Sequence, residues 1–92
     1  MKEFHYRIED PNGMHARPAG QLANYAKRFE SAIRVRYKEK DADAKRLLSL
    51  MSLGAVHGGE LVFSVEGIDE EEAALALERF CKNGFAAPQE SN

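Results

Sequence analysis

The chain has 92 residues, of which 43% are hydrophobic, and a formal net charge of −2. This length suits one domain, and seven glycines and three prolines are too few for a disordered chain. The single cysteine excludes an internal disulfide, and no apolar run suits a signal peptide or a membrane span. We therefore expect a cytoplasmic protein without membrane insertion, with one domain over residues 1–86 and a flexible tail over residues 87–92.

Charge is distributed unevenly along the chain. Residues 1–48 contain 11 Lys or Arg against 7 Asp or Glu, whereas residues 49–92 contain 2 against 8. If the fold keeps these halves apart, one side of the molecule is basic. A basic side suits a nucleic acid, an anionic small group or an acidic protein, and composition does not choose among them.

Hydrophobic periodicity predicts a strand, a helix and two further strands in the first half of the chain. Apolar residues alternate over 4–8, stop at the turn residues 10–13, and recur at helical spacing over 19–29. A second alternating segment covers residues 33–37, with basic side chains on its other face. A short third strand is expected near residues 40–44.

The second half of the chain predicts a brief helix, a fourth strand and a long helix. Apolar residues cluster over 47–51 and alternate over 61–65. Asp69 and Glu72 form a capping-box pattern at the start of the last helix, whose apolar stripe covers residues 73–81. The resulting order, β-α-β-β-α-β-α, predicts a four-stranded sheet with helices on its apolar face.

The segment over residues 13–19, Gly-Met-His-Ala-Arg-Pro-Ala, is unusual for the start of a helix. The expected N-cap is His15, and Arg17 puts a cation at the positive end of the helix dipole. An anion would explain both choices, because the free amides of Ala16 and Arg17 and the Arg17 guanidinium can bind a phosphoryl group. Neutral imidazole is a competent nucleophile, so the segment predicts transient phosphorylation of His15.

Other kinds of site have weaker support. A lone histidine beside a turn is ordinarily a surface residue, and the unusual helix start is what argues for a site at His15. His5 and His57 do not complete a metal-ligand spacing with it, and no phosphate-binding glycine loop occurs, so we expect no metal and no cofactor. The basic face that includes Arg34 and Arg36 lacks aromatic residues for base stacking, so we expect no nucleic-acid binding.

Two separated motifs resemble the HPr family, the histidine-containing phosphocarriers of the bacterial sugar phosphotransferase system. Residues 13–19 are similar to the active-site signature of that family. Residues 47–54, Leu-Leu-Ser-Leu-Met-Ser-Leu-Gly, are similar to the segment around its second helix. The resemblance covers about residues 2–85. It implies an α+β fold, an HPr-like open-faced β-sandwich in which three helices cover one face of a four-stranded antiparallel sheet, and it implies a monomer.

The resemblance also implies a function. In the family, the histidine that matches His15 accepts a phosphoryl group from phosphorylated enzyme I, which phosphoenolpyruvate has charged, and passes it to a sugar-specific enzyme IIA. The residue that matches Arg17 assists the transfer. Such a protein is a carrier with a phosphohistidine intermediate rather than a stand-alone catalyst. The alternative is a regulatory or specialised HPr-like phosphotransfer protein that does not serve bulk sugar uptake.

The second motif is expected to form a docking surface beside His15. Leu48 and Met51 are the side chains expected to stay exposed, and methionine suits a surface that binds several partners. Some of the other leucines of the motif are expected to be buried. The predicted docking residues are Lys27, Lys45, Arg46, Leu47, Leu48, Met51 and Ser52.

Arg46 is a departure from the family pattern. Many members have a regulatory serine at this position, which a specific kinase phosphorylates so that the protein binds a catabolite-control regulator. An arginine cannot form a phosphoryl ester, and neither Ser49 nor Ser52 is at the matching position. We therefore predict that this chain is not a normal substrate of that kinase.

Overall fold

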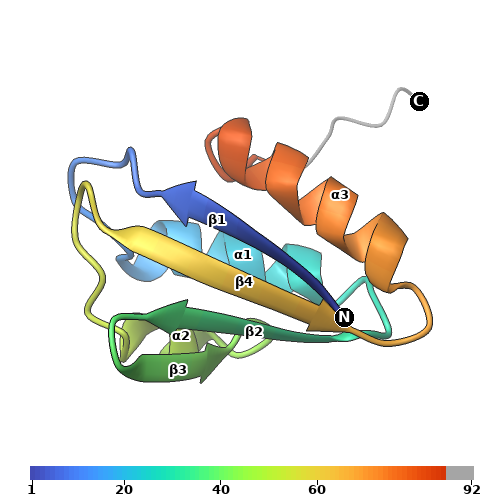
Figure 1. Cartoon of the computed structure of the whole chain (residues 1–92). Coiled ribbons are helices and arrows are strands. Elements are labelled where there is room, and N and C mark those ends of the chain that lie inside the picture. Colours follow the sequence, from blue (N-terminus) through green and yellow to red (C-terminus); the bar gives the residue numbers. More distant parts are fainter. Residues whose placement is uncertain (87–92) are drawn as a thin grey trace.

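The computed structural model describes residues 1–86, so the predicted flexible tail lies outside the described residues (Figure 1). Among residues 1–86, no helix has the length and apolar character needed to cross a bilayer. The order of elements is the predicted one. The elements are β1 (Lys2–Arg7), α1 (Ala16–Ala26), β2 (Ala32–Tyr37), β3 (Lys40–Asp43), α2 (Leu47–Met51), β4 (Glu60–Glu66) and α3 (Glu70–Lys82).

The four strands form one antiparallel sheet in the order β1-β4-β2-β3. Strand β4 is central, and its Phe63 lies opposite Phe4 of β1 and opposite Val35 of β2. The rings of Phe4 and Phe63 stack with centroids 4.6 Å apart. In Figure 1, α1 and α2 lie behind the sheet, and α3 packs against β1 and β4. The predicted open-faced α+β sandwich is confirmed.

Burial follows the alternation of the strands. In β2, Ile33 and Val35 are buried against the helices, whereas Arg34 and Arg36 are exposed on the open face. The Arg34 guanidinium contacts the Asp41 carboxylate of β3 at 2.6 Å. Part of the basic charge of β2 is thus paired within the sheet, on a face whose charged side chains are exposed to solvent.

Helices α1 and α3 turn their apolar stripes toward the sheet and meet each other. The rings of Tyr25 in α1 and Phe80 in α3 stack with centroids 4.6 Å apart. Cys81 lies in the same buried stripe, and burial raises the pKa of its thiol far above the ordinary value. This cysteine is therefore a protonated core residue rather than a reactive group.

The predicted capping box at the start of α3 is wrong. Asp69 occupies the N-cap position, but its carboxylate makes no capping hydrogen bond. The carboxylate instead accepts hydrogen bonds from the Ser31 hydroxyl and from the backbone amides of Glu30 and Ser31, both at 2.9 Å. The Ser31 hydroxyl, followed by the amides, holds the pKa of Asp69 below its usual value. Asp69 thus ties the loop before β2 to the loop before α3.

Candidate functional site

His15 stands at the start of α1 with its side chain toward solvent. It is the N-cap residue, with extended backbone angles of −94° and −173°, and its imidazole makes no capping hydrogen bond. Its carbonyl oxygen accepts the first helical bond from the Ala19 amide at 3.0 Å. The side chain is 39% exposed. The sequence therefore located the N-cap correctly, and a partner molecule can reach the ring.

Backbone contacts hold the loop that presents His15. The Gly13 amide donates to the Asp10 carbonyl oxygen at 3.0 Å, and the Met14 amide donates to the Ala55 carbonyl oxygen at 2.9 Å. Gly13 has a φ of +70°, and a Cβ at this residue would lie 2.4 Å from the Ala55 oxygen. Only glycine fits this left-handed, closely packed position. The loop before α1 is thereby fixed against the segment that follows α2.

Sequence reasoning missed an acidic neighbour of the histidine. The Asp10 carboxylate Oδ2 lies 3.3 Å from Nε2 of His15. Its other oxygen, Oδ1, accepts a hydrogen bond of 2.8 Å from the Asn12 amide. That amide, and then the His15 ring, hold the pKa of Asp10 below its usual value, so the carboxylate is ionised at neutral pH. An aspartate before Pro-Asn-Gly signals a turn, and nothing in that pattern signals a contact with His15.

The predicted phosphate-binding groups lie in the first turn of α1. The amides of Ala16 and Arg17 belong to the turn whose N–H groups have no acceptor within the helix, and no acidic residue occurs there. The Arg17 side chain is exposed, and it forms no ion pair with any other residue of the described part of the chain. Two backbone donors and a guanidinium are therefore available beside His15.

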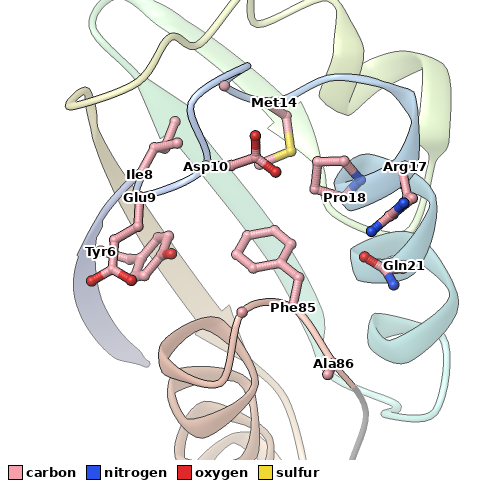
Figure 2. Close-up of a pocket in the computed structure, with 12 residues that line it drawn as sticks. Tyr6, Ile8, Glu9, Asp10, Met14, Arg17, Pro18, Gln21, Phe85 and Ala86 are labelled. Carbon is pink, nitrogen blue, oxygen red and sulfur yellow. The ribbon is translucent and has the colours of Figure 1, made fainter.

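A cavity of about 420 Å³ borders the site on the side of α3 (Figure 2). Arg17 and Gln21 of α1 face Tyr6 of β1 across this cavity, with the Phe85 ring between them. Asp10, whose carboxylate contacts the His15 ring, also lines the cavity, whereas His15 itself does not. Arg17 thus belongs both to the first turn of α1 and to the wall of this cavity.

Helix α2 presents an apolar patch to solvent. Leu48 is 78% exposed, and Leu47 and Met51 are also exposed, whereas Leu50 and Leu53 are buried. The predicted exposure of Leu48 and Met51, and the predicted burial of some of the other leucines, are confirmed, whereas docking through the exposed side chains stays a prediction. The patch adjoins α1, because a Cβ on Gly20 would lie 4.0 Å from the Leu47 side chain.

Basic residues lie beside the apolar patch. Lys45 donates from Nζ to the Phe29 carbonyl oxygen at 2.6 Å, so its ammonium group is anchored. Arg46 is the exposed N-cap of α2 and makes no capping hydrogen bond. Ser52 lies at the other end of α2, where its hydroxyl donates to the Ser49 carbonyl oxygen at 2.6 Å. One shallow hollow is lined by Lys27, Lys45, Arg46, Leu47 and Leu48.

Comparisons with known proteins agree on one family. The family described as "PTS HPr component phosphorylation site" matches residues 2–83. The phosphocarrier protein HPr of Lysinibacillus sphaericus is 46% identical over 77 residues, which are 84% of this chain and 88% of that protein. A multiphosphoryl transfer protein of Vibrio cholerae is 43% identical over 75 residues, which cover 78% of this chain and 19% of that protein.

A solved structure supports the same assignment. The crystal structure of HPr-C-His from Thermoanaerobacter tengcongensis is 38% identical and superposes with a TM-score of 0.87, over 97% of this chain and 100% of that chain. The fold, together with the matched phosphorylation-site family, defines a phosphocarrier of the phosphotransferase system. The chain belongs to the HPr family.

Proposed function

We propose that His15 accepts a phosphoryl group from phosphorylated enzyme I and passes it to a sugar-specific enzyme IIA. The observation that carries this proposal is the solvent-facing imidazole at the N-cap of α1, which makes no capping bond. A helix start ordinarily uses its N-cap side chain to satisfy the first amides. Here those amides stay free beside a nucleophile, and the match to a phosphorylation-site family supports the same role.

The chain's own groups supply positioning and charge compensation for the transfer. A ring nitrogen of His15 attacks phosphorus, the bond from phosphorus to the donor histidine breaks, and its electron pair returns to the donor. Charge on the transferring group is spread over its oxygens. The amides of Ala16 and Arg17 and the Arg17 guanidinium can balance that charge without reorganisation. The same groups serve transfer to enzyme IIA, and no cofactor is required.

The proposed docking surface consists of the exposed side chains of α2 and the basic residues beside them. Leu48 and Met51 offer apolar contact, and the flexible methionine side chain can adapt to partners of different shape. Lys27, Lys45 and Arg46 attract acidic partner surfaces and speed their encounter. One face then serves enzyme I and enzyme IIA in turn, which suits a monomeric carrier in the cytoplasm.

Labelling with enzyme I and phosphoenolpyruvate tests the proposal. We expect one acid-labile phosphohistidine per chain, and none in a His15→Ala variant. His57→Ala is the matched control, because His57 is also an exposed loop histidine and lies outside the proposed site. Absence of labelling with several different enzymes I would refute the proposal, as would equal labelling of the His15→Ala variant.

Arg46 supports a second candidate, a specialised phosphotransfer protein outside bulk sugar uptake. Its charged side chain occupies the N-cap of α2, where many relatives have a regulatory serine. Transfer from the phosphorylated chain to enzyme IIA proteins of sugar and non-sugar branches separates the candidates. Fast transfer to a sugar enzyme IIA favours the first candidate, and transfer confined to a non-sugar branch favours the second.

A further inference from the structure

The turn before α1 orients the Asp10 carboxylate at both of its oxygens. Oδ1 accepts the Asn12 amide at 2.8 Å, and Oδ2 lies 3.3 Å from Nε2 of His15. The Gly13 amide closes the same turn on the Asp10 carbonyl oxygen at 3.0 Å. The bond from the Asn12 amide to Oδ1 therefore leaves Oδ2 as the oxygen that faces His15. The catalytic groups proposed above do not use this carboxylate.

The chemistry of the two groups determines where the ring proton lies. An ionised carboxylate only accepts hydrogen bonds, and a neutral imidazole has one N–H and one nitrogen lone pair. Because Oδ2 of Asp10 can only accept, its contact with Nε2 of His15 favours the tautomer in which Nε2 is protonated. Nδ1, the nitrogen closer to the main chain, then has the lone pair.

We propose that Asp10 is a positioning residue for His15, whose carboxylate orients the imidazole ring and holds its proton on Nε2. This inference rests on the proposed role of His15 as the phosphoryl acceptor. Asp10 does not contact the phosphoryl group itself. It acts through the ring, whereas Arg17 and the first amides of α1 act on the phosphoryl oxygens.

The transfer step balances with this arrangement. The Nδ1 lone pair forms the new bond to phosphorus, the bond between phosphorus and the donor nitrogen breaks, and its electron pair stays with the donor. The proton on Nε2 does not move, so the phosphorylated ring is formally an imidazolium. The Asp10 carboxylate compensates this positive charge through a charge-assisted hydrogen bond, which is expected to become shorter than 3.3 Å. Transfer to an acceptor returns the electron pair to Nδ1.

Two substitutions of Asp10 separate this role from a structural one. In Asp10→Asn, the Asn12 amide retains the side-chain oxygen, and the new NH₂ group faces Nε2 of His15. That NH₂ group donates, so it favours the tautomer protonated on Nδ1. In Asp10→Ala, no side chain faces the ring and both tautomers coexist. We therefore expect Asp10→Asn, the more conservative change, to impair His15 more than Asp10→Ala does.

The test measures the ¹⁵N chemical shifts of the two ring nitrogens of His15 in the unphosphorylated protein, at a pH where this ring is neutral. We expect the Nε2–H tautomer in the parent chain, a mixture in Asp10→Ala, and mainly Nδ1–H in Asp10→Asn. Rates of phosphorylation by enzyme I should fall in the same order, by roughly 3- to 10-fold for Asp10→Ala and further for Asp10→Asn. Glu9→Gln is the control for lost charge in the same segment, since Glu9 is exposed and has no hydrogen bond to His15.

An unchanged tautomer ratio in both Asp10 variants would overturn the inference, as would an equal shift in Glu9→Gln. The tautomer measurement needs no enzyme I. If the parent chain is never labelled, the proposed function fails and the tautomer result still stands. If the parent is labelled but its tautomer does not respond to Asp10, the inference fails and the proposed function stands.

Discussion

The backbone amide of Met14 donates a hydrogen bond of 2.9 Å to the carbonyl oxygen of Ala55. Met14 belongs to the motif over residues 13–19, and Ala55 directly follows the motif over residues 47–54. The bond therefore connects the loop that holds His15 to the segment that ends the proposed docking surface. Two motifs that are distant in sequence belong to one structural unit, and disturbing the bond is expected to affect both.

A Gly13→Ala substitution tests this connection. The added Cβ would meet the Ala55 oxygen at 2.4 Å and the Val56 Cα at 2.9 Å, at a φ of +70°. We expect the free energy of unfolding to fall by about 1–3 kcal/mol, and phosphorylation of His15 to slow. Urea unfolding followed by circular dichroism measures the first effect, and labelling with enzyme I measures the second.

Gly54→Ala is the control for Gly13→Ala. Gly54 also has a positive φ, +64°, but a Cβ at this residue would meet no other atom within 4 Å. Only the backbone conformation is then unfavourable, at about 1 kcal/mol. Equal losses of stability in the two variants would show that the contact with Ala55 has no special effect.

Truncation of leucines in and beside α2 separates docking from folding. Leu48 is exposed, so Leu48→Ala should change the free energy of unfolding by less than about 0.5 kcal/mol. We expect it to weaken binding to enzyme I severalfold, because it removes apolar area from the proposed interface. Leu50 is fully buried, and Leu50→Ala should destabilise the fold by about 2–5 kcal/mol. Titration calorimetry and urea unfolding measure the two effects.

Leu75→Ala provides the matched control for Leu48→Ala, because Leu75 is an exposed leucine on α3. It should bind enzyme I as the parent chain does. If Leu48→Ala and Leu75→Ala weaken binding equally, the docking surface has been placed on the wrong helix.

Local patterns predicted the elements of this fold because those patterns depend on near neighbours. Alternation placed β2 and its buried Ile33, and the turn glycines marked where strands stop. Asp69 shows the limit of such patterns. A helix-start aspartate indicates a cap, but its carboxylate binds Ser31, 38 residues away in sequence. A loop that is brought close only by the tertiary structure provided better donors than the helix itself.

The candidate site was predictable to a similar extent. The unusual N-cap drew attention to His15 and Arg17, because both residues conflict with what a helix start prefers. Asp10 agrees with the residue preference of its own turn, since an aspartate is favourable there whether or not it contacts a histidine. A residue whose local role is satisfied gives no sequence signal of a second role. Its contact with His15 is visible only in the folded loop.

Arg46 leads to a prediction about regulation. The resemblance to the family implies a kinase-phosphorylated serine at this position, whereas this chain has an exposed arginine at the N-cap of α2. Incubation with that kinase and ATP should leave the mass of the intact protein unchanged. Arg46→Ser should restore an acceptor at the matching position and add one phosphoryl group. Stoichiometric phosphoserine in the parent chain would contradict the prediction.

The contact of Asp69 with Ser31 predicts how stability depends on pH. Hydrogen bonds from the Ser31 hydroxyl and the nearby amides lower the pKa of Asp69 in the folded protein. In the unfolded chain an aspartate has a pKa of about 3.9. The contact therefore stabilises the fold fully above that value, and the stabilisation is lost as the pH falls from about 4 through the lower folded pKa.

Asp69→Asn and Ser31→Ala test this dependence by urea unfolding at a series of pH values. Asp69→Asn should be less stable than the parent at neutral pH, and the difference should shrink toward zero in acid. Ser31→Ala removes the hydroxyl of a buried side chain and should cost about 1–2 kcal/mol at neutral pH. Glu39→Gln, at an exposed residue of the turn between β2 and β3, should leave the pH dependence unchanged. A difference between Asp69→Asn and the parent that is constant from neutral pH to acid would show that Asp69 stabilises the fold without its charge.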